Sequence, residues 1–117
     1  MSEETCTWTG VSGTTYIFYV YPRPPEVPSR PGNYIYARQN AEKLWVPTFI
    51  GQGDLAVCCE DDQALMDCID GHAATHLHMR LCSTEWERLA VHADLLGAYK
   101  NAFPPDGCNS PEDAPPT

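Results

Sequence analysis

Cysteine and histidine residues gather in the second half of the sequence, where their types and spacing could support metal chemistry. Cys68 and His72 are four residues apart, a separation that places both side chains on one face of a helix. A thiolate with an imidazole favours Zn²⁺ over Mg²⁺. The sequence has no two cysteines separated by two residues, a spacing typical of structural zinc sites. Ordinary thiols and surface imidazoles are therefore the favoured interpretation, and no cofactor is expected, with Zn²⁺ or Mg²⁺ as alternatives.

The redox state of the six cysteines depends on the compartment in which the protein resides. The first residues, Met1-Ser2-Glu3-Glu4, lack the apolar segment of a signal peptide, and no apolar run is long enough to cross a membrane. We therefore expect a cytoplasmic protein without membrane association, whose thiols stay reduced. Cys68 and Cys82 are then expected to be small core residues.

Acidic side chains are concentrated in one window, residues 54–70. The formal net charge is −9, and no Lys or Arg occurs between Lys43 and Arg80. Such a surface repels phosphates, so direct nucleic-acid binding is not expected. It suits a basic protein partner, although an acidic face that only keeps the protein soluble is the alternative. The carboxylates that we expect to bind the partner are Glu60, Asp61, Asp62, Asp67 and Asp70.

The apolar patterns predict the elements that position these residues. Pro47 lies inside a predicted strand, which implies an edge position or a bulge. Thr84 and Glu87 have the spacing of a capping box at the start of the longest helix. The apolar stripe predicted for that helix is Trp86, Leu89, Ala90, Ala93, Leu96 and Ala98. The predicted strands are 7–10, 15–21, 33–37, 45–50 and 75–81, and the predicted helices are 63–71 and 84–101.

A length of 117 residues fits a single domain. The predicted fold class is α+β, with a small antiparallel or mixed sheet of three central strands plus an N-terminal hairpin, flanked by helices. The expected domain is 1–109, made of the hairpin 7–21, a proline-rich connector 22–31 and a core 32–109. Residues 110–117 are expected to be a disordered acidic, proline-rich tail.

Several motifs occur in an order that resembles a known family. The runs 31–36 (Pro-Gly-Asn-Tyr-Ile-Tyr) and 49–52 (Phe-Ile-Gly-Gln) look like the paired strands of the GIY-YIG nuclease superfamily. Segments 8–22, 71–78, 87–96 and 104–109 are similar to small stand-alone bacterial and phage members. The resemblance implies an intracellular bacterial or phage protein with a three-stranded antiparallel sheet. It also implies metal-assisted phosphodiester cleavage by a tyrosine, a phosphate-binding arginine and a metal-binding glutamate.

This sequence departs from the family at the positions that carry charge. The arginine position holds Cys58, the glutamate position holds His92, and Phe49 replaces the second tyrosine, whereas Tyr34 remains. Loss of such electrostatic groups commonly costs several kcal/mol of barrier, so no catalytic residue is expected and these four positions are vestigial. If the resemblance holds, Cys58 and His92 both point into the former cleft, and they join Cys68 and His72 as candidate metal ligands.

The sequence therefore favours a pseudoenzyme, a catalytically inactive GIY-YIG-like domain that acts as an acidic protein-binding module. Its expected partner is a basic or nucleic-acid-binding protein, which it inhibits in the manner of phage anti-defence or immunity proteins. The alternative is a divergent metal-dependent nuclease that cleaves DNA or RNA with a rebuilt site containing Tyr34 and His92. A zinc-stabilised structural protein is the third hypothesis.

Overall fold

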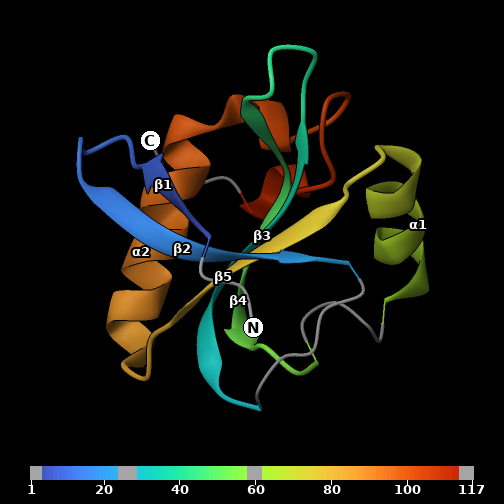
Figure 1. The fold of residues 1–117 in the computed structure, drawn as a ribbon. Coiled ribbons are helices and arrows are strands. Elements are labelled where there is room, and N and C mark those ends of the chain that lie inside the picture. Colours follow the sequence, from blue (N-terminus) through green and yellow to red (C-terminus); the bar gives the residue numbers. More distant parts are fainter. Residues whose placement is uncertain (1–3, 24–28, 58–61, 114–117) are drawn as a thin grey trace.

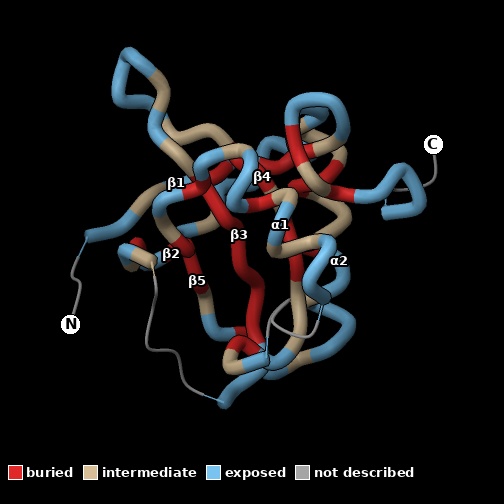
Figure 2. The backbone as a smooth tube through the Cα atoms, turned by 90° about the vertical axis from the view of Figure 1, so that its right-hand side faces the viewer, coloured by how far each residue is buried: buried red, intermediate tan, exposed pale blue. Residues whose placement is uncertain are grey.

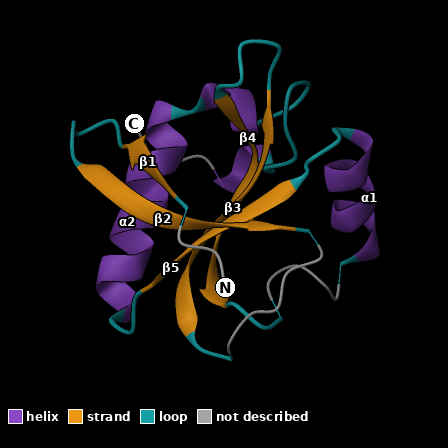
Figure 3. Cartoon of the chain, in the orientation of Figure 1, coloured by secondary structure: helices purple, strands orange, loops and turns teal. Residues whose placement is uncertain are grey.

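In the residues that the structure describes, a five-stranded antiparallel sheet carries one helix on each face (Figure 1). A computed structural model describes residues 4–23, 29–57 and 62–113. The predicted α+β class is confirmed, and Figure 3 shows the sheet between the two helices. In the part of the chain so described, no helix is both long and apolar enough to cross a membrane. The elements are β1 (Thr5–Thr9), β2 (Thr15–Pro22), β3 (Pro31–Gln39), β4 (Trp45–Asp54), α1 (Gln63–Gly71), β5 (His76–Leu81), α2 (Glu85–Ala98), and the 3-10 turns η1 (Lys100–Ala102) and η2 (Pro111–Asp113).

The strand order is β1-β2-β5-β3-β4, and every neighbouring pair is antiparallel. The last strand in the sequence, β5, lies between β2 and β3, so the N-terminal hairpin joins the same sheet as the three later strands. The result is one five-stranded sheet, and the hairpin is not a separate addition to a three-stranded core. The ordered chain continues past the domain boundary predicted at 109, because η2 forms there.

The proline in β4 occupies the kind of position that its chemistry requires. β4 is an edge strand, and its pairing with β3 shifts from Tyr36–Phe49 to Ala37–Pro47, which leaves Thr48 as an extra residue. Proline cannot donate to the hydrogen-bond ladder, so both an edge and a bulge accommodate it. The prediction from Pro47 is confirmed on both counts.

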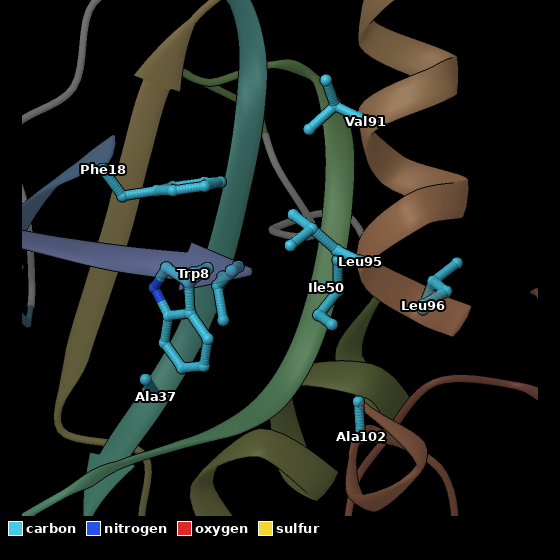
Figure 4. Close-up of a cluster of buried hydrophobic side chains, with 9 residues drawn as sticks. Trp8, Phe18, Ala37, Ile50, Val91, Leu95, Leu96 and Ala102 are labelled. Atoms are coloured by element: carbon cyan, nitrogen blue, oxygen red, sulfur yellow. The ribbon is translucent and has the colours of Figure 1, made fainter. Parts of the chain in front are cut away.

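Two hydrophobic clusters fill the two faces of the sheet, and burial is concentrated along the central strands (Figure 2). On the α2 face, Val91 and Leu95 reach toward the strand that carries Ile50 (Figure 4). On the α1 face, Leu77 and Met79 pack with Ile69. The strand predicted over 75–81 is confirmed, and its alternate residues Leu77 and Met79 share one face of the sheet. Its His78, however, is fully buried, so the expectation of a surface imidazole is wrong at that position.

The buried face of α2 differs from the predicted stripe. Val91, Leu95 and Leu96 are buried, whereas Trp86 is 74% exposed and Leu89 is 44% exposed. The longer aliphatic side chains bury more apolar area than the alanines on which the prediction depended. The capping box is also absent, because the side chain of Thr84 makes no hydrogen bond at the helix start.

The outer edge of β4 is closed by residues 102–109, which follow α2 and are called the closing segment below. Asn109 is fully buried, accepts from the backbone N–H of Ile50 at 2.9 Å and donates to the carbonyl oxygen of Ile50 at 2.9 Å. The backbone N–H of Cys108 donates to the carbonyl oxygen of Thr48 at 2.8 Å. Backbone groups that an edge strand would otherwise expose are thus satisfied by side chain and backbone of one short segment.

The hairpin of β1 and β2 is tied to α2 through one carboxylate. Asp94 accepts hydrogen bonds from the Ser12 backbone N–H at 2.9 Å, the Ser12 hydroxyl at 2.7 Å and the Tyr16 hydroxyl at 2.7 Å. Gly10 lies so close that a Cβ there would collide with this carboxylate. Desolvation opposes ionisation of Asp94, but the hydrogen bonds from Ser12 and Tyr16 outweigh it and lower its pKa below 3.8.

Replacing this carboxylate should loosen the hairpin. We expect Asp94→Ala to lower the free energy of unfolding by about 1 to 2 kcal/mol at neutral pH, because it leaves donors unpaired. Since the folded state depresses the pKa of Asp94, this stabilisation is present above the unfolded value of 3.8 and is lost as pH falls through the lower folded value. Urea unfolding at pH 7 and pH 3 measures the difference. Asp106→Ala, at an exposed position, is the control, and an equal loss in both variants would contradict the assignment.

Candidate functional site

Tyr34, in the segment that resembles the first family motif, is a packed aromatic residue on the α1 face. Its side chain is 4% exposed, and its ring centroid lies 6.1 Å from that of Phe49. Gly51 pairs with Tyr34 across the sheet, and a Cβ on Gly51 would collide with the tyrosine ring. The glycine of the second motif therefore has a steric role, since it makes room for this ring.

His92 comes from α2 and lies at the outer edge of β4. Its Nε2 is 3.2 Å from the carbonyl oxygen of Ile50, and only a protonated nitrogen can make that hydrogen bond. Burial lowers the pKa of His92, although the hydrogen bond to Ile50 and the charge of Asp113 act in the opposite direction. The imidazole is thus neutral at pH 7 and donates through Nε2, which leaves that nitrogen unable to act as a base or bind a metal in this arrangement.

The positions predicted to be vestigial are spread over two sides of the sheet. Tyr34 and Phe49 belong to the cluster beneath α1, whereas His92 extends from the helix on the opposite face. Cys58, at the arginine position, lies outside the described residues, as do Glu60 and Asp61. The structure therefore brings together Tyr34 and Phe49, and it places His92 with the closing segment beside Asn109, since both contact the Ile50 carbonyl.

Three of the carboxylates expected to bind a partner lie within α1 or at its N-cap. Asp67 and Asp70 are exposed, together with Asp62 at the start of the helix. Each also has a local partner: Asp62 accepts from the N–H of Leu65 at 3.0 Å, and Asp67 accepts from Gln63 at 2.8 Å. Asp70 forms an ion pair with Arg23 at 2.9 Å. Within the described segments, Asp62 and Asp67 form no ion pair, so both are more available to a basic partner than Asp70.

The expectation that all thiols are reduced is wrong for one pair. Cys68 on α1 and Cys108 in the closing segment form a disulfide, with their Cα atoms 6.0 Å apart. The closing segment is held against β4 by the Cys108–Thr48 hydrogen bond, and this brings Cys108 to the side of α1. Cys6 and Cys82 are free thiols among the described residues, and Cys82 is buried, as predicted.

His72 completes a group of three ligand-type side chains. The Sγ atoms of Cys68 and Cys108 and a ring nitrogen of His72 all lie within 4.8 Å of one another. The pair predicted from sequence, Cys68 and His72, is therefore part of the group. Cys108 joins them without having been predicted, whereas the candidate His92 is not part of the group and Cys58 lies outside the described residues. A cavity of about 470 Å³ lies beside both cysteines, with Phe49, Leu65, Asp62 and Asp113 among its lining residues.

Comparisons with known proteins leave the site to be interpreted from its own chemistry. No family model matches the chain, and neither does any curated protein or solved structure. The geometry offers a cysteine–histidine group beside a cavity, and acidic helix surfaces next to an exposed tryptophan. The first suits metal or thiol chemistry, and the second suits recognition of another macromolecule.

Two residues of this arrangement were missed by sequence reasoning. Cys108 is 40 residues from Cys68, and no local spacing rule connects cysteines at that distance. Trp86 was assigned to the core because its position fits a helical stripe. The neighbours Glu85 and Glu87, charged on both sides of it, were the available signal that this turn faces solvent.

Proposed function

We propose that the chain is a non-catalytic GIY-YIG-like domain that binds a basic, nucleic-acid-binding protein and inhibits it. The observation that carries the proposal is the hydrogen bond that His92 makes to the backbone of β4. Its Nε2 is occupied by the Ile50 carbonyl, so the position that would hold a metal-binding glutamate in the resembling family contributes to packing. Tyr34 is likewise enclosed by Gly51 and Phe49. Neither residue is presented as a solvent-facing catalytic group.

The first turns of α2 supply an apolar anchor for such a partner. Trp86 and Leu89 are three residues apart on one helix face, and both are exposed. Tryptophan is enriched among residues that dominate binding energy at protein interfaces. Glu85 and Glu87 precede and follow the tryptophan in the first turn, so exposed acidic side chains lie on the two helix faces next to the anchor. An apolar centre with a charged rim is the usual organisation of a protein-binding surface.

The charge of the whole chain indicates the chemistry of the partner. A net charge of −9 on 117 residues attracts basic surfaces and repels phosphates. Proteins that bind nucleic acid carry such basic surfaces, because they neutralise phosphates with lysine and arginine. An acidic domain that covers that surface competes directly with the nucleic acid, which is how we propose that inhibition arises.

Mutation of the anchor and of its rim tests this proposal separately. Against purified basic nucleic-acid-binding proteins, we expect Trp86→Ala to raise the Kd about thirtyfold, since loss of an interface tryptophan costs about 2 kcal/mol. Glu85→Lys with Glu87→Lys should mainly slow association and reduce its salt dependence. Calorimetry and stopped-flow measurements report these two effects. Ile17→Ala, at a residue 62% exposed on the hairpin, is the matched control.

A nuclease assay decides between binding and catalysis. Wild type, Tyr34→Phe and His92→Ala are incubated with single- and double-stranded DNA and RNA in Mg²⁺, Mn²⁺ or Zn²⁺. Cleavage by the wild type that disappears in both variants would overturn the proposal and establish a divergent nuclease. Equal affinity of wild type and Trp86→Ala for every partner that binds would remove α2 as the binding surface.

A further inference from the structure

We propose that Cys68, His72 and Cys108 form a Zn²⁺ site when the two thiols are reduced, and that this site alternates with the Cys68–Cys108 disulfide. The proposal is independent of the binding surface on α2, because it concerns the junction between α1 and the closing segment. It commits to a soft divalent cation, since two thiolates and an imidazole select Zn²⁺ over Mg²⁺.

The geometry requires little rearrangement. Zinc lies about 2.3 Å from thiolate sulfur and about 2.0 to 2.1 Å from imidazole nitrogen, so its ligand atoms are nearly 4 Å apart. The three ligand atoms here are already within 4.8 Å of one another. His72 is the C-cap of α1, and its backbone N–H donates to the carbonyl oxygen of Cys68 at 3.0 Å, which fixes the relative position of the two residues. A small separation of the two sulfurs would admit the ion.

The cavity beside the cysteines supplies the space for a further ligand. Three protein ligands leave one position of a tetrahedral zinc ion open to water or to a bound molecule. The cavity of about 470 Å³ borders both Cys68 and Cys108, and all three ligand residues are partly exposed, so ions can enter. Asp62 and Asp113 in the cavity wall favour the approach of a cation electrostatically.

The change of state balances as a thiol–disulfide exchange followed by metal binding. Two molecules of a small thiol lose their S–H hydrogens and form one disulfide between them, while the Cys68–Cys108 bond breaks and each sulfur gains a hydrogen. Zn²⁺ then displaces the two thiol protons to solvent, and neutral His72 donates a lone pair. A small-molecule disulfide reverses the sequence by taking two electrons from the cysteine pair, and Zn²⁺ is released.

Both states fasten α1 to the closing segment, by a covalent bond or through the metal. Binding of the ion to the native arrangement alone therefore compensates for part of the stability lost on reduction. The switch changes the contents of the cavity wall, because a disulfide is replaced by a zinc ion held by two thiolates and an imidazole. The net charge stays the same, since the two thiolates neutralise the ion. A reducing compartment is thus compatible with a fold whose oxidised form carries a disulfide.

Metal titration of the full chain tests the proposal. The protein is reduced with a phosphine, freed of metal and titrated anaerobically with Zn²⁺ or with Co²⁺, whose absorption reports thiolate ligands. We expect one ion per reduced chain, with thiolate-to-cobalt charge transfer, and none in the oxidised chain. Absence of binding to the reduced wild type, or a cobalt spectrum without thiolate bands, overturns the proposal.

Variants distinguish a metal site from a disulfide alone. His72→Ala should weaken Zn²⁺ binding at least tenfold while the chain still forms the disulfide, as measured by thiol counting after oxidation. Cys108→Ser should abolish both, and Cys6→Ser should change neither. If Cys108→Ser fails to fold, the His72→Ala comparison still decides. Unchanged Zn²⁺ affinity in His72→Ala overturns the three-ligand site.

Discussion

Loss of the Cys68–Cys108 bond is expected to lower the free energy of unfolding by about 4 kcal/mol, from the loop-closure entropy of a cross-link of this span. The bond joins residues 40 apart, so it restricts a large part of the unfolded chain. The free energy of unfolding should also fall more steeply with urea concentration, because an unfolded chain without the cross-link exposes more surface.

The measurement compares the oxidised wild type with Cys68→Ala/Cys108→Ala by urea unfolding in a metal chelator. The chelator separates this effect from stabilisation by Zn²⁺. Cys6→Ala, which removes a free thiol, is expected to leave the urea dependence unchanged. A double variant that unfolds at the same urea concentration as the wild type would show that the bond contributes nothing to stability.

Stability is also expected to decrease on the order of 3 kcal/mol as the pH falls from 6.5 to about 4, because of His78. This side chain is fully buried, and its Nδ1 accepts a hydrogen bond from Trp8 Nε1 at 2.9 Å. Desolvation, with a smaller contribution from His76, lowers the pKa of His78 to about 4. Protonation therefore requires the acceptor nitrogen and the buried ring to take up a charge.

The sign follows from the two pKa values. Between pH 6.5 and about 4 the unfolded chain binds a proton at His78 and the folded chain does not, so acid favours unfolding throughout this interval. Above pH 6.5 and below about pH 4, His78 does not contribute to the change of the free energy of unfolding with pH. His92, whose pKa burial also lowers, acts in the same direction.

His78→Gln tests the origin of the slope. Glutamine keeps an acceptor for Trp8 but does not titrate, so the variant should be less stable at pH 7 and lose most of the slope between pH 6.5 and 4. Urea unfolding at half-unit pH intervals provides the measurement. An identical slope in variant and wild type would assign the pH dependence to other groups.

Local patterns were sufficient to predict most of the elements. Helix α1 coincides with the predicted 63–71, and Pro47 indicated both the edge and the bulge, because backbone chemistry acts within a few residues. The pairing of strands that are far apart in the sequence could not be predicted from local patterns. The insertion of β5 between β2 and β3 depends on contacts between distant segments, which no local period encodes.

The candidate site was predicted in part. Cys68 and His72 were recognised because their four-residue spacing is a property of the helix itself, whereas Cys108 becomes their neighbour only through the closing segment. The helix face of α2 was misassigned because alanines at 90 and 93 count as apolar although they bury little area. His78 was misassigned because alternation identifies a face of a strand and cannot say that a second layer covers it.

The hydrogen bonds of Cys108 and Asn109 to β4 have a consequence for oligomerisation. An edge strand with open backbone groups is a template for pairing with another copy of itself. In this fold, the segment that closes β4 follows α2 and precedes η2, and it is held by the Asn109 amide, the Cys108 backbone and the bond to Cys68. Any truncation that removes residues 102–109 would uncover Thr48 and Ile50 as free pairing sites, and we expect it to favour pairing of β4 with a second copy of the chain.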